Sequence, residues 1–188
     1  MSRSVCVYCG SADGSRPAHA EAATALGSSL ADDGLEVVYG GARVGLMGRL
    51  ADAALARGGR VVGVMPTQLG RYEVEHRSLT ELVWADGLHE RKRLMAERAD
   101  AFVVLPGGFG TLDEALETIN MKQLKAHAKP IVLVDVEGFF THLVALFDAL
   151  TDHGFAYAAS RDLCRVVGGV SDVVPALRAT WGEAAAHV

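Results

Sequence analysis

Three acidic side chains stand close together near the middle of the chain, at Asp113, Glu114 and Glu117. They follow a glycine-rich segment, Pro106-Gly-Gly-Phe-Gly-Thr-Leu112. A positioned carboxylate can accept a proton, attack as a nucleophile or stabilise a developing cation. Backbone N–H groups that glycine leaves uncovered can bind an anion. This combination predicts a carboxylate held beside a bound phosphate ester.

The elements around these side chains form a strand, a glycine turn and the start of a helix. Residues 101–105 are apolar and rich in β-formers, which predicts a buried parallel strand. Pro106 has no N–H to donate and ends that strand. From Thr111 the pattern becomes helical, with an apolar face formed by Leu112, Ala115, Leu116 and Ile119. The free N–H groups and partial positive charge of a helix start make such a turn suited to phosphate.

Glu114 also has a simpler interpretation as part of a helix cap. Thr111 and Glu114 have the spacing of a capping box, and acidic residues in a first helical turn complement the helix dipole. Capping alone does not require glycine at three of four positions, Gly107, Gly108 and Gly110. The ligand site is therefore the favoured interpretation, and capping is the alternative.

The composition is typical of one soluble α/β domain spanning residues 1–188, with 50% hydrophobic and 22% charged residues. No apolar run approaches the roughly 18–20 residues that a membrane helix needs, and the first residues lead straight into a strand. We therefore expect neither a signal peptide nor a membrane partner. A net charge of −5 argues against a nucleic-acid partner.

The cysteines and histidines predict no special chemistry. Three cysteines, an odd number, imply no disulfide framework and favour a reducing, cytoplasmic setting. Cys6 and Cys9 have the spacing of a redox pair, but residues three apart in a strand face opposite ways. We expect both to be small buried hydrophobic side chains. The seven histidines show no metal-ligand spacing, so no metal is predicted.

The chain alternates predicted strands with predicted helices, which is typical of a doubly wound parallel sheet with helices on both faces. Strands are expected at residues 4–8, 35–39, 60–65, 79–84, 101–105, 130–134 and 165–167. Helices are expected at residues 17–32, about 48–57, 88–98, from 111 onward, 139–152 and 173–183. Residues 67–78 are polar and irregular, and either a mobile flap or a solvated loop fits them.

A second glycine-rich turn follows the second strand, with Gly40, Gly41, Gly45 and Gly48. It is no Walker A loop, because no Gly-Lys-Ser/Thr follows. The loop after the first strand lacks the G-x-G-x-x-G of dinucleotide-binding enzymes. One glycine pair is weak evidence for a ligand, but two such turns meet at the carboxyl edge of a parallel sheet, where ligands bind.

A charged helix start lies at the same edge of the predicted sheet, with His89, Glu90, Arg91, Lys92 and Arg93. An exposed helix face with i,i+4 pairs is the simpler interpretation. However, this helix leads directly into the strand at residues 101–105. A fixed arginine at that edge suits a phosphate, a base or a carboxylate.

Three signatures occur in order along the chain. They are Val5-Cys-Val-Tyr-Cys-Gly-Ser11, then Tyr39-Gly-Gly-Ala-Arg-Val-Gly-Leu-Met-Gly48, and then His89-Glu-Arg-Lys92 with Pro106-Gly-Gly-Phe-Gly-Thr-Leu-Asp-Glu114. Together they resemble the Lonely Guy (LOG) family, the cytokinin riboside 5′-monophosphate phosphoribohydrolases, long mislabelled as lysine decarboxylases. The resemblance covers almost the whole chain.

The resemblance implies a Rossmann-like sheet of about seven strands and a two-fold dimer with sites near the interface. It implies hydrolysis of the N-glycosidic bond of N6-substituted AMP to free base and ribose 5-phosphate, without a cofactor. Arg91 and Glu114 match the catalytic pair of the family. The residues expected to contact substrate are Gly40, Gly41, Gly45, Glu73, Arg91, Lys92, Gly107, Gly108, Phe109, Gly110, Thr111, Leu112, Asp113, Glu114 and Asn120.

The chain departs from the family pattern at three places that bear on base preference more than on the chemistry. Leu88 stands where methionine is common, Asn120-Met-Lys replaces a usual Thr-Trp-Ala, and Arg43 occupies a turn that often carries a small residue. An ordinary pKa near 4 would leave Glu114 ionised at pH 7, with the roles of nucleophile, base and cation stabiliser all open. Arg91 would orient Glu114 and hold substrate.

Two other functions compete with hydrolysis. Relatives of similar fold resemble molybdenum-cofactor carriers, so a non-catalytic nucleotide or cofactor carrier is the main alternative. A pyridoxal-phosphate decarboxylase is disfavoured because no lysine stands in a recognisable Schiff-base context. Release of free base from isopentenyl-AMP separates the enzyme from the carrier.

Overall fold

A seven-stranded, wholly parallel sheet forms the centre of the protein. The computed structural model describes residues 2–70 and 74–185. The strand order is β4-β3-β2-β1-β5-β6-β7, and each neighbouring pair is parallel. The strands are β1 Ser4–Tyr8, β2 Glu36–Tyr39, β3 Val61–Pro66, β4 Glu81–Ala85, β5 Ala101–Val104, β6 Ile131–Val134 and β7 Arg165–Val167. The predicted Rossmann-like fold is confirmed.

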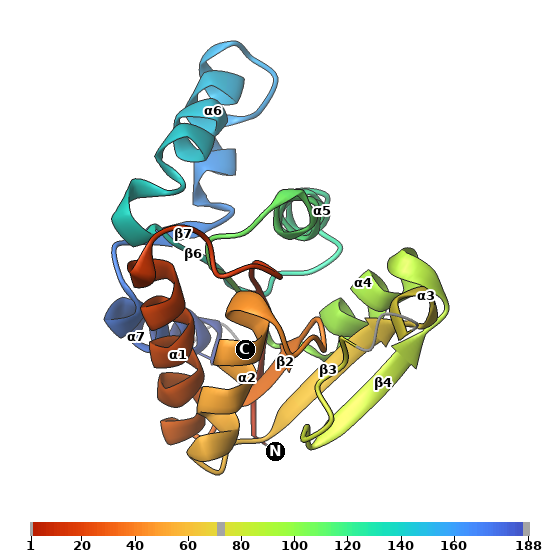
Figure 1. Ribbon diagram of the computed structural model, residues 1–188. Coiled ribbons are helices and arrows are strands. Elements are labelled where there is room, and N and C mark those ends of the chain that lie inside the picture. Colours follow the sequence, from red (N-terminus) through yellow and green to blue (C-terminus); the bar gives the residue numbers. More distant parts are fainter. Residues whose placement is uncertain (1, 71–73, 186–188) are drawn as a thin grey trace.

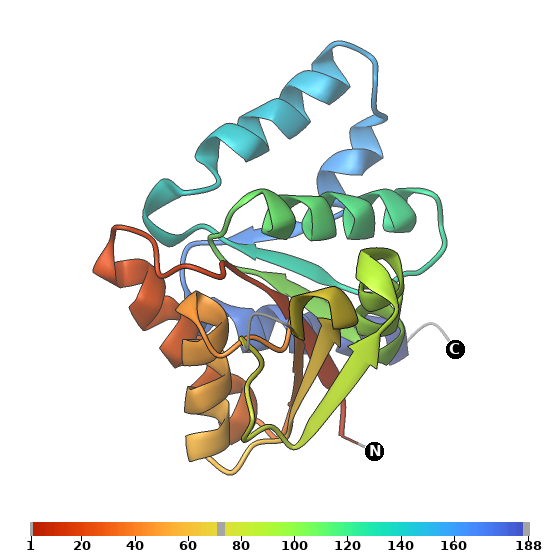
Figure 2. The ribbon, with the colours of Figure 1, turned by 45° about the vertical axis from the view of Figure 1, so that its right-hand side comes forward.

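Helices cover both faces of the sheet and give a three-layered molecule (Figures 1 and 2). One face carries α1 Pro17–Asp32, α2 Gly45–Ala56 and α7 Val173–Ala185. The other carries α4 Gly87–Arg98, α5 Phe109–Gln123 and α6 Thr141–Asp152, while α3 Thr67–Gly70 is a single turn after β3. Within the described ranges, no helix combines the length and apolar character of a membrane span.

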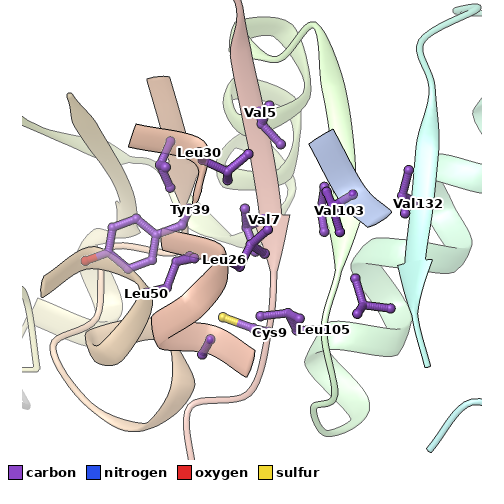
Figure 3. Packing of buried hydrophobic residues seen from close by; sticks show 14 of the residues in the cluster. Val5, Val7, Cys9, Leu26, Leu30, Tyr39, Leu50, Val103, Leu105 and Val132 are labelled. Atoms are coloured by element: carbon purple, nitrogen blue, oxygen red, sulfur yellow. The ribbon is translucent and has the colours of Figure 1, made fainter. Parts of the chain in front are cut away.

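Strand side chains alternate between two cores, because successive residues of a strand point to opposite faces. In the first strand, Val5 and Val7 pack toward α1 and α2, as Figure 3 shows, whereas Cys6 packs toward α4 and α5. Cys9 belongs to the same core as Val5 and Val7. The two cysteines thus face apart as predicted, both are free and buried, and burial raises the pKa of each thiol.

Several element boundaries differ from the predictions. The strand expected at 79–84 lies at Glu81–Ala85, and Pro66 closes β3 by pairing with Ala85 at the strand end, where its missing N–H is tolerated. Part of the segment expected to be irregular forms α3. The helix expected from residue 111 begins at Phe109, and the helix expected from 48 begins at Gly45.

The order of strands defines where a ligand is expected. From β1 the chain proceeds outward through β2, β3 and β4, and from β5 it proceeds the other way through β6 and β7. The crevice above the carboxyl ends of β1 and β5 is therefore the topological switch point, where open α/β sheets bind ligands. The turn after β5 and the loop after β1 meet there, and the Gly10 N–H donates to the Pro106 carbonyl at 3.1 Å.

Candidate active site

The start of α5 presents backbone N–H groups that have no acceptor within the helix at this crevice. Gly108 is the N-cap with an extended backbone and no side-chain cap, and the first helical bond runs from the Leu112 N–H to the Gly108 carbonyl at 3.1 Å. The N–H groups of residues 109–111 precede that bond and have no helical acceptor. The capping box that was the alternative interpretation does not form, because Thr111 lies inside the first turn and is buried. The helix begins two residues earlier because Gly108 adopts the cap.

The three glycines of this turn serve two purposes. A Cβ at Gly107 would overlap the Thr111 hydroxyl, so glycine is required here because Thr111 packs against the backbone. A Cβ at Gly108 or Gly110 would meet nothing within 4 Å. Two glycines therefore leave the surface around the free N–H groups uncovered, which is the arrangement an anion site requires.

Arg91 of α4 is fixed by three neighbours. Its Nε donates to the Val64 carbonyl at 3.0 Å, and its Nη1 donates to Oε1 of Glu114. A Cβ at Gly40 would overlap Nη2, so glycine at the end of β2 makes room for the guanidinium. The side chains of Arg91 and Glu114 are 13% and 10% exposed. The pair is thus a largely buried, preorganised ion pair at the carboxyl edge of the sheet.

Burial sets the acidity of Glu114. It raises the pKa of this carboxyl above its ordinary value, and the charge and hydrogen bond of Arg91 oppose the shift without cancelling it. The sequence predicts an ordinary pKa for Glu114, and this prediction is wrong because the pKa is raised. A carboxylate in a site with little water interacts strongly with a nearby cation, because few solvent dipoles screen it.

Lys92 forms ion pairs with the other two acidic side chains, Asp113 and Glu117. Its Nζ lies 3.0 Å from Oδ2 of Asp113 and 2.5 Å from Oε2 of Glu117, linking α4 to α5. The hydrogen bond that Lys92 donates to Glu117 is the largest cause that raises the pKa of Lys92. Of the three neighbouring acids, two are paired with lysine, and Glu114 alone pairs with Arg91.

A cavity of about 240 Å³ joins these parts. It is lined by Val7, Cys9, Ser11, Gly40, Met47, Arg91, Gly108, Phe109, Gly110, Thr111 and Glu114. We call it the reaction cavity. It brings together the predicted pair, the predicted turn and Gly40. Cys9, Ser11 and Met47 were not predicted, although Ser11 ends the first signature and its loop follows a strand at the same edge.

Other predicted contacts lie elsewhere. Gly41 and Gly45 have φ values of +81° and +60° and serve backbone packing: a Cβ on Gly45 would overlap the Ser11–Ala12 backbone. Asn120 is exposed further along α5 and does not line the reaction cavity. Leu112 packs against the core under α5. Glu73 falls outside the described residues.

Two further cavities adjoin the reaction cavity through shared wall residues. One, of about 290 Å³, shares Ser11 and Gly108 and is also lined by Gly107. The other, of about 380 Å³, shares Glu114 and is lined by both α4 and α5. Among the residues that the structure describes, no group of three or more His, Cys, Asp or Glu side chains could hold a metal ion.

Comparison with known proteins identifies the family. The model of a family described as "possible lysine decarboxylase" matches residues 47–177. The probable cytokinin riboside 5′-monophosphate phosphoribohydrolase LOGL9 of Oryza sativa subsp. japonica is 45% identical over 161 residues, covering 86% of this chain and 71% of the rice protein. This chain is a member of the Lonely Guy family. The predicted resemblance is confirmed.

Further relatives of this LOG-family protein agree. The cytokinin riboside 5′-monophosphate phosphoribohydrolase LOG7 of Arabidopsis thaliana is 41% identical over 157 residues, which cover 84% of this chain and 72% of LOG7. Among solved structures, the molybdenum cofactor carrier protein of Chlamydomonas reinhardtii matches with a TM-score of 0.74 at 20% identity, covering 97% of this chain and 99% of the carrier. At that identity the likeness shows the fold alone.

Proposed function

We propose that this LOG-family protein hydrolyses the N-glycosidic bond of cytokinin riboside 5′-monophosphates to free base and ribose 5-phosphate. The buried Arg91–Glu114 ion pair, set beside the open N–H groups of α5, carries the proposal. The activity named for relatives at 41–45% identity supports it. A carrier needs no buried carboxylate next to its anion site, whereas glycosidic hydrolysis does.

The reaction breaks the bond between C1′ of ribose and N9 of the base. The bonding electron pair leaves with the base, and C1′ becomes an oxocarbenium-like cation. Water then adds its oxygen to C1′, and a water proton ends on the base. The carboxylate of Glu114 faces the cation and stabilises it, or accepts the water proton as it attacks. Arg91 holds that carboxylate in place and limits its rotation.

The phosphate supplies the binding energy that places the sugar. The N–H groups of residues 109–111 and the dipole of α5 receive the 5′-phosphate. Anchoring there positions C1′ over Glu114, so binding far from the reacting bond contributes to turnover. Because Gly108 and Gly110 expose their backbone, the phosphate can approach without a steric barrier.

Replacement of the carboxylate tests the proposal. Glu114→Gln should lower kcat on isopentenyl-AMP by about 10²–10⁴, the range for a positioned acid or base. Release of free base is measured by chromatography. Glu117→Gln is the matched control, because it makes the same change one helical turn away on a side chain that pairs with Lys92. Wild-type turnover in Glu114→Gln would refute the assignment, and nucleotide binding by the native chain without base release would favour a carrier.

A Schiff base on Lys92, the lysine next to Arg91 in α4, is disfavoured by the state of its side chain. A Schiff-base lysine must lose its proton to attack a carbonyl, so a lowered pKa favours that role. The pKa of Lys92 is instead raised, and its ammonium pairs with Asp113 and Glu117.

We infer that a second copy of the chain covers α6, giving a homodimer. None of the α6 side chains, all of which the structure describes, is buried. Apolar side chains on and after this helix are exposed, including Leu146, Leu150, Phe155 and Tyr157. Figure 2 shows α6 standing away from the sheet, above α5. Exposed apolar patches of this kind mark interfaces.

Three free thiols fit the cytoplasmic setting that we propose.

The dimer is tested by charging the α6 surface. Leu146→Glu should halve the mass measured by light scattering at low micromolar concentration, because a buried unpaired charge opposes association. Glu137→Gln, on an exposed side chain before α6, should keep the wild-type mass. A wild-type protein that is already monomeric would remove the inference.

A further inference from the structure

A second cavity lies beside the reaction cavity. It has a volume of about 290 Å³ and meets the reaction cavity at Ser11 and Gly108. Its walls are the loop of residues 10–15, the turn before α5, and His19 of α1. Of these two cavities, the reaction cavity is lined by Arg91 and Glu114 and the second one is not. We call this second space the loop cavity.

His19 is a buried polar side chain without a hydrogen-bond partner. The residue is 8% exposed, and among the described residues neither imidazole nitrogen takes part in a hydrogen bond. The ring meets Phe139 edge-on, with centroids 5.6 Å apart. A Cβ at Gly14, where φ is +75°, would lie 2.8 Å from Nδ1. The ring nitrogens of His19 are not among the fully enclosed side-chain atoms of the described residues that lack a partner, so they reach the cavity that His19 lines and are available to a ligand there.

The charges around the loop cavity admit an anion. Asp13 also lines it, but Arg49 holds that carboxylate at 2.6 Å and compensates its charge. Gly107 and Gly108 bring the start of α5 to the opposite wall. The imidazole of His19 on one side and the open backbone at Gly108, next to the N–H groups of residues 109–111, on the other form a polar clamp of the kind that binds phosphate.

The geometry of the substrate divides it between the two cavities. In a nucleoside monophosphate the phosphorus is several bonds from C1′, so a phosphate held at the start of α5 lies away from Glu114 and can reach past Gly108, where the two cavities meet. We propose that the 5′-phosphate of the substrate enters the loop cavity and accepts a hydrogen bond from the imidazole of His19. This inference rests on the proposed function. It makes His19 a residue that selects nucleotides over nucleosides.

Paired ligands test the inference in the Glu114→Gln background, where the substrate persists. Affinities for isopentenyl-AMP and isopentenyladenosine are measured by calorimetry. His19→Phe keeps a ring against Phe139 but loses both nitrogens, so the nucleotide affinity should fall about tenfold, as expected for a hydrogen bond to a charged group. The nucleoside affinity should stay the same. His19→Gln restores an N–H donor and should recover part of the loss.

Two results would overturn the inference. One is a nucleotide affinity within about twofold of the parent in His19→Phe, since a hydrogen bond to a charged group exceeds that. The other is an equal loss for nucleotide and nucleoside, which a packing role would cause. His153→Phe, at the exposed end of α6, is the matched control and should change neither affinity.

Failure of this inference and failure of the proposed function give different results. Base release by the native chain tests hydrolysis and does not require His19 to contact phosphate. A selective loss of nucleotide affinity in His19→Phe, combined with no base release by the native chain, would keep the phosphate contact and reject the hydrolase. Base release by the native chain, combined with an unchanged preference of His19→Phe for nucleotide over nucleoside, would keep the hydrolase and reject the phosphate contact.

Discussion

Two glycine-rich turns at the same edge of the sheet use their missing side chains in opposite ways. In the turn from β2 to α2, a Cβ at Gly45 would overlap the backbone of Ser11, and one at Gly48 would overlap the backbone of Arg43. In the turn from β5 to α5, a Cβ at Gly108 or Gly110 would meet nothing within 4 Å. In the first turn neighbouring backbone fills the space beside Gly45 and Gly48, whereas in the second the backbone is open at Gly108 and Gly110, although Gly107 packs against Thr111.

The comparison shows that glycine content alone does not identify a ligand site. A glycine can be required because another part of the protein occupies the space of its side chain, or because a ligand does. Gly40 links the two cases, since it makes room for the guanidinium that holds Glu114. The β2–α2 turn thus supports the site, and the β5–α5 turn forms the surface that substrate meets.

The largest effect is expected where the two turns are connected, at Arg91. Arg91→Ala leaves the buried carboxylate of Glu114 without its cation, which should destabilise the fold by about 3–5 kcal/mol at mildly alkaline pH. Turnover should fall at least about 10²-fold, because the carboxylate loses its orientation. Urea unfolding and base-release kinetics measure the two losses.

A double variant separates the lost charge pair from lost packing. Arg91→Ala combined with Glu114→Gln removes the unpaired charge, so it should be more stable than Arg91→Ala alone. Equal stability of the single and double variants would mean that the ion pair does not hold α4 to α5. In that case the two turns would be independent of each other.

A matched pair of alanine substitutions tests the comparison directly. Gly45→Ala should cost about 3 kcal/mol, because the methyl group meets the Ser11 backbone and φ is positive. Gly110→Ala should leave stability unchanged or raise it by up to about 1 kcal/mol, since alanine favours a helix and the space is open. Urea unfolding of both variants provides the comparison.

The order of the two effects should be reversed for nucleotide affinity, with the larger loss in Gly110→Ala. Gly110→Ala places a methyl group at the exposed start of α5, so the affinity for isopentenyl-AMP should fall about tenfold or more. If Gly110→Ala bound nucleotide like the wild type, the open surface would not be a ligand site. If Gly45→Ala were fully stable, the packing explanation of the β2–α2 turn would fail.

Much of this could be predicted from the sequence, for reasons that differ between fold and site. β1 and β5 read as continuous apolar runs because they are buried on both faces, and their predicted bounds hold within a residue. Side-chain pairing was harder, because periodicity does not show which face of α4 meets α5. The sequence predicts that Lys92 contacts substrate, and its spacing does not show that the ammonium also pairs with Asp113 and Glu117.

Other features depend on distances in space that the sequence does not contain. The spacing of Thr111 and Glu114 fits a capping box, but Gly108 begins the helix earlier and the cap does not form. Arg91 and Glu114 lie 23 residues apart on two helices, so their contact followed from the family resemblance and not from spacing. The unpaired imidazole of His19 has no sequence signal at all, because burial and the missing partner appear only in the folded chain.

The smallest expected effect is a displacement of the pH profile. Glu114 must be ionised to face a cation, and burial raises its pKa, so at a given acidic pH more of it is protonated than of an exposed glutamate. The acid limb of kcat should therefore lie at higher pH than the ordinary carboxyl range. Measuring kcat at saturating substrate reports the bound complex and avoids titration of the free nucleotide phosphate.

Replacing Arg91 sharpens this last test. The guanidinium is the main influence that lowers the pKa of Glu114, so Arg91→Met should move the acid limb of its residual activity to still higher pH. Glu117→Gln, whose carboxylate pairs with Lys92, should leave the limb in place. An acid limb that does not move in Arg91→Met would mean that another group controls ionisation in the reaction cavity. The preorganised pair that distinguishes the open turn from the packed one would then have no part in turnover.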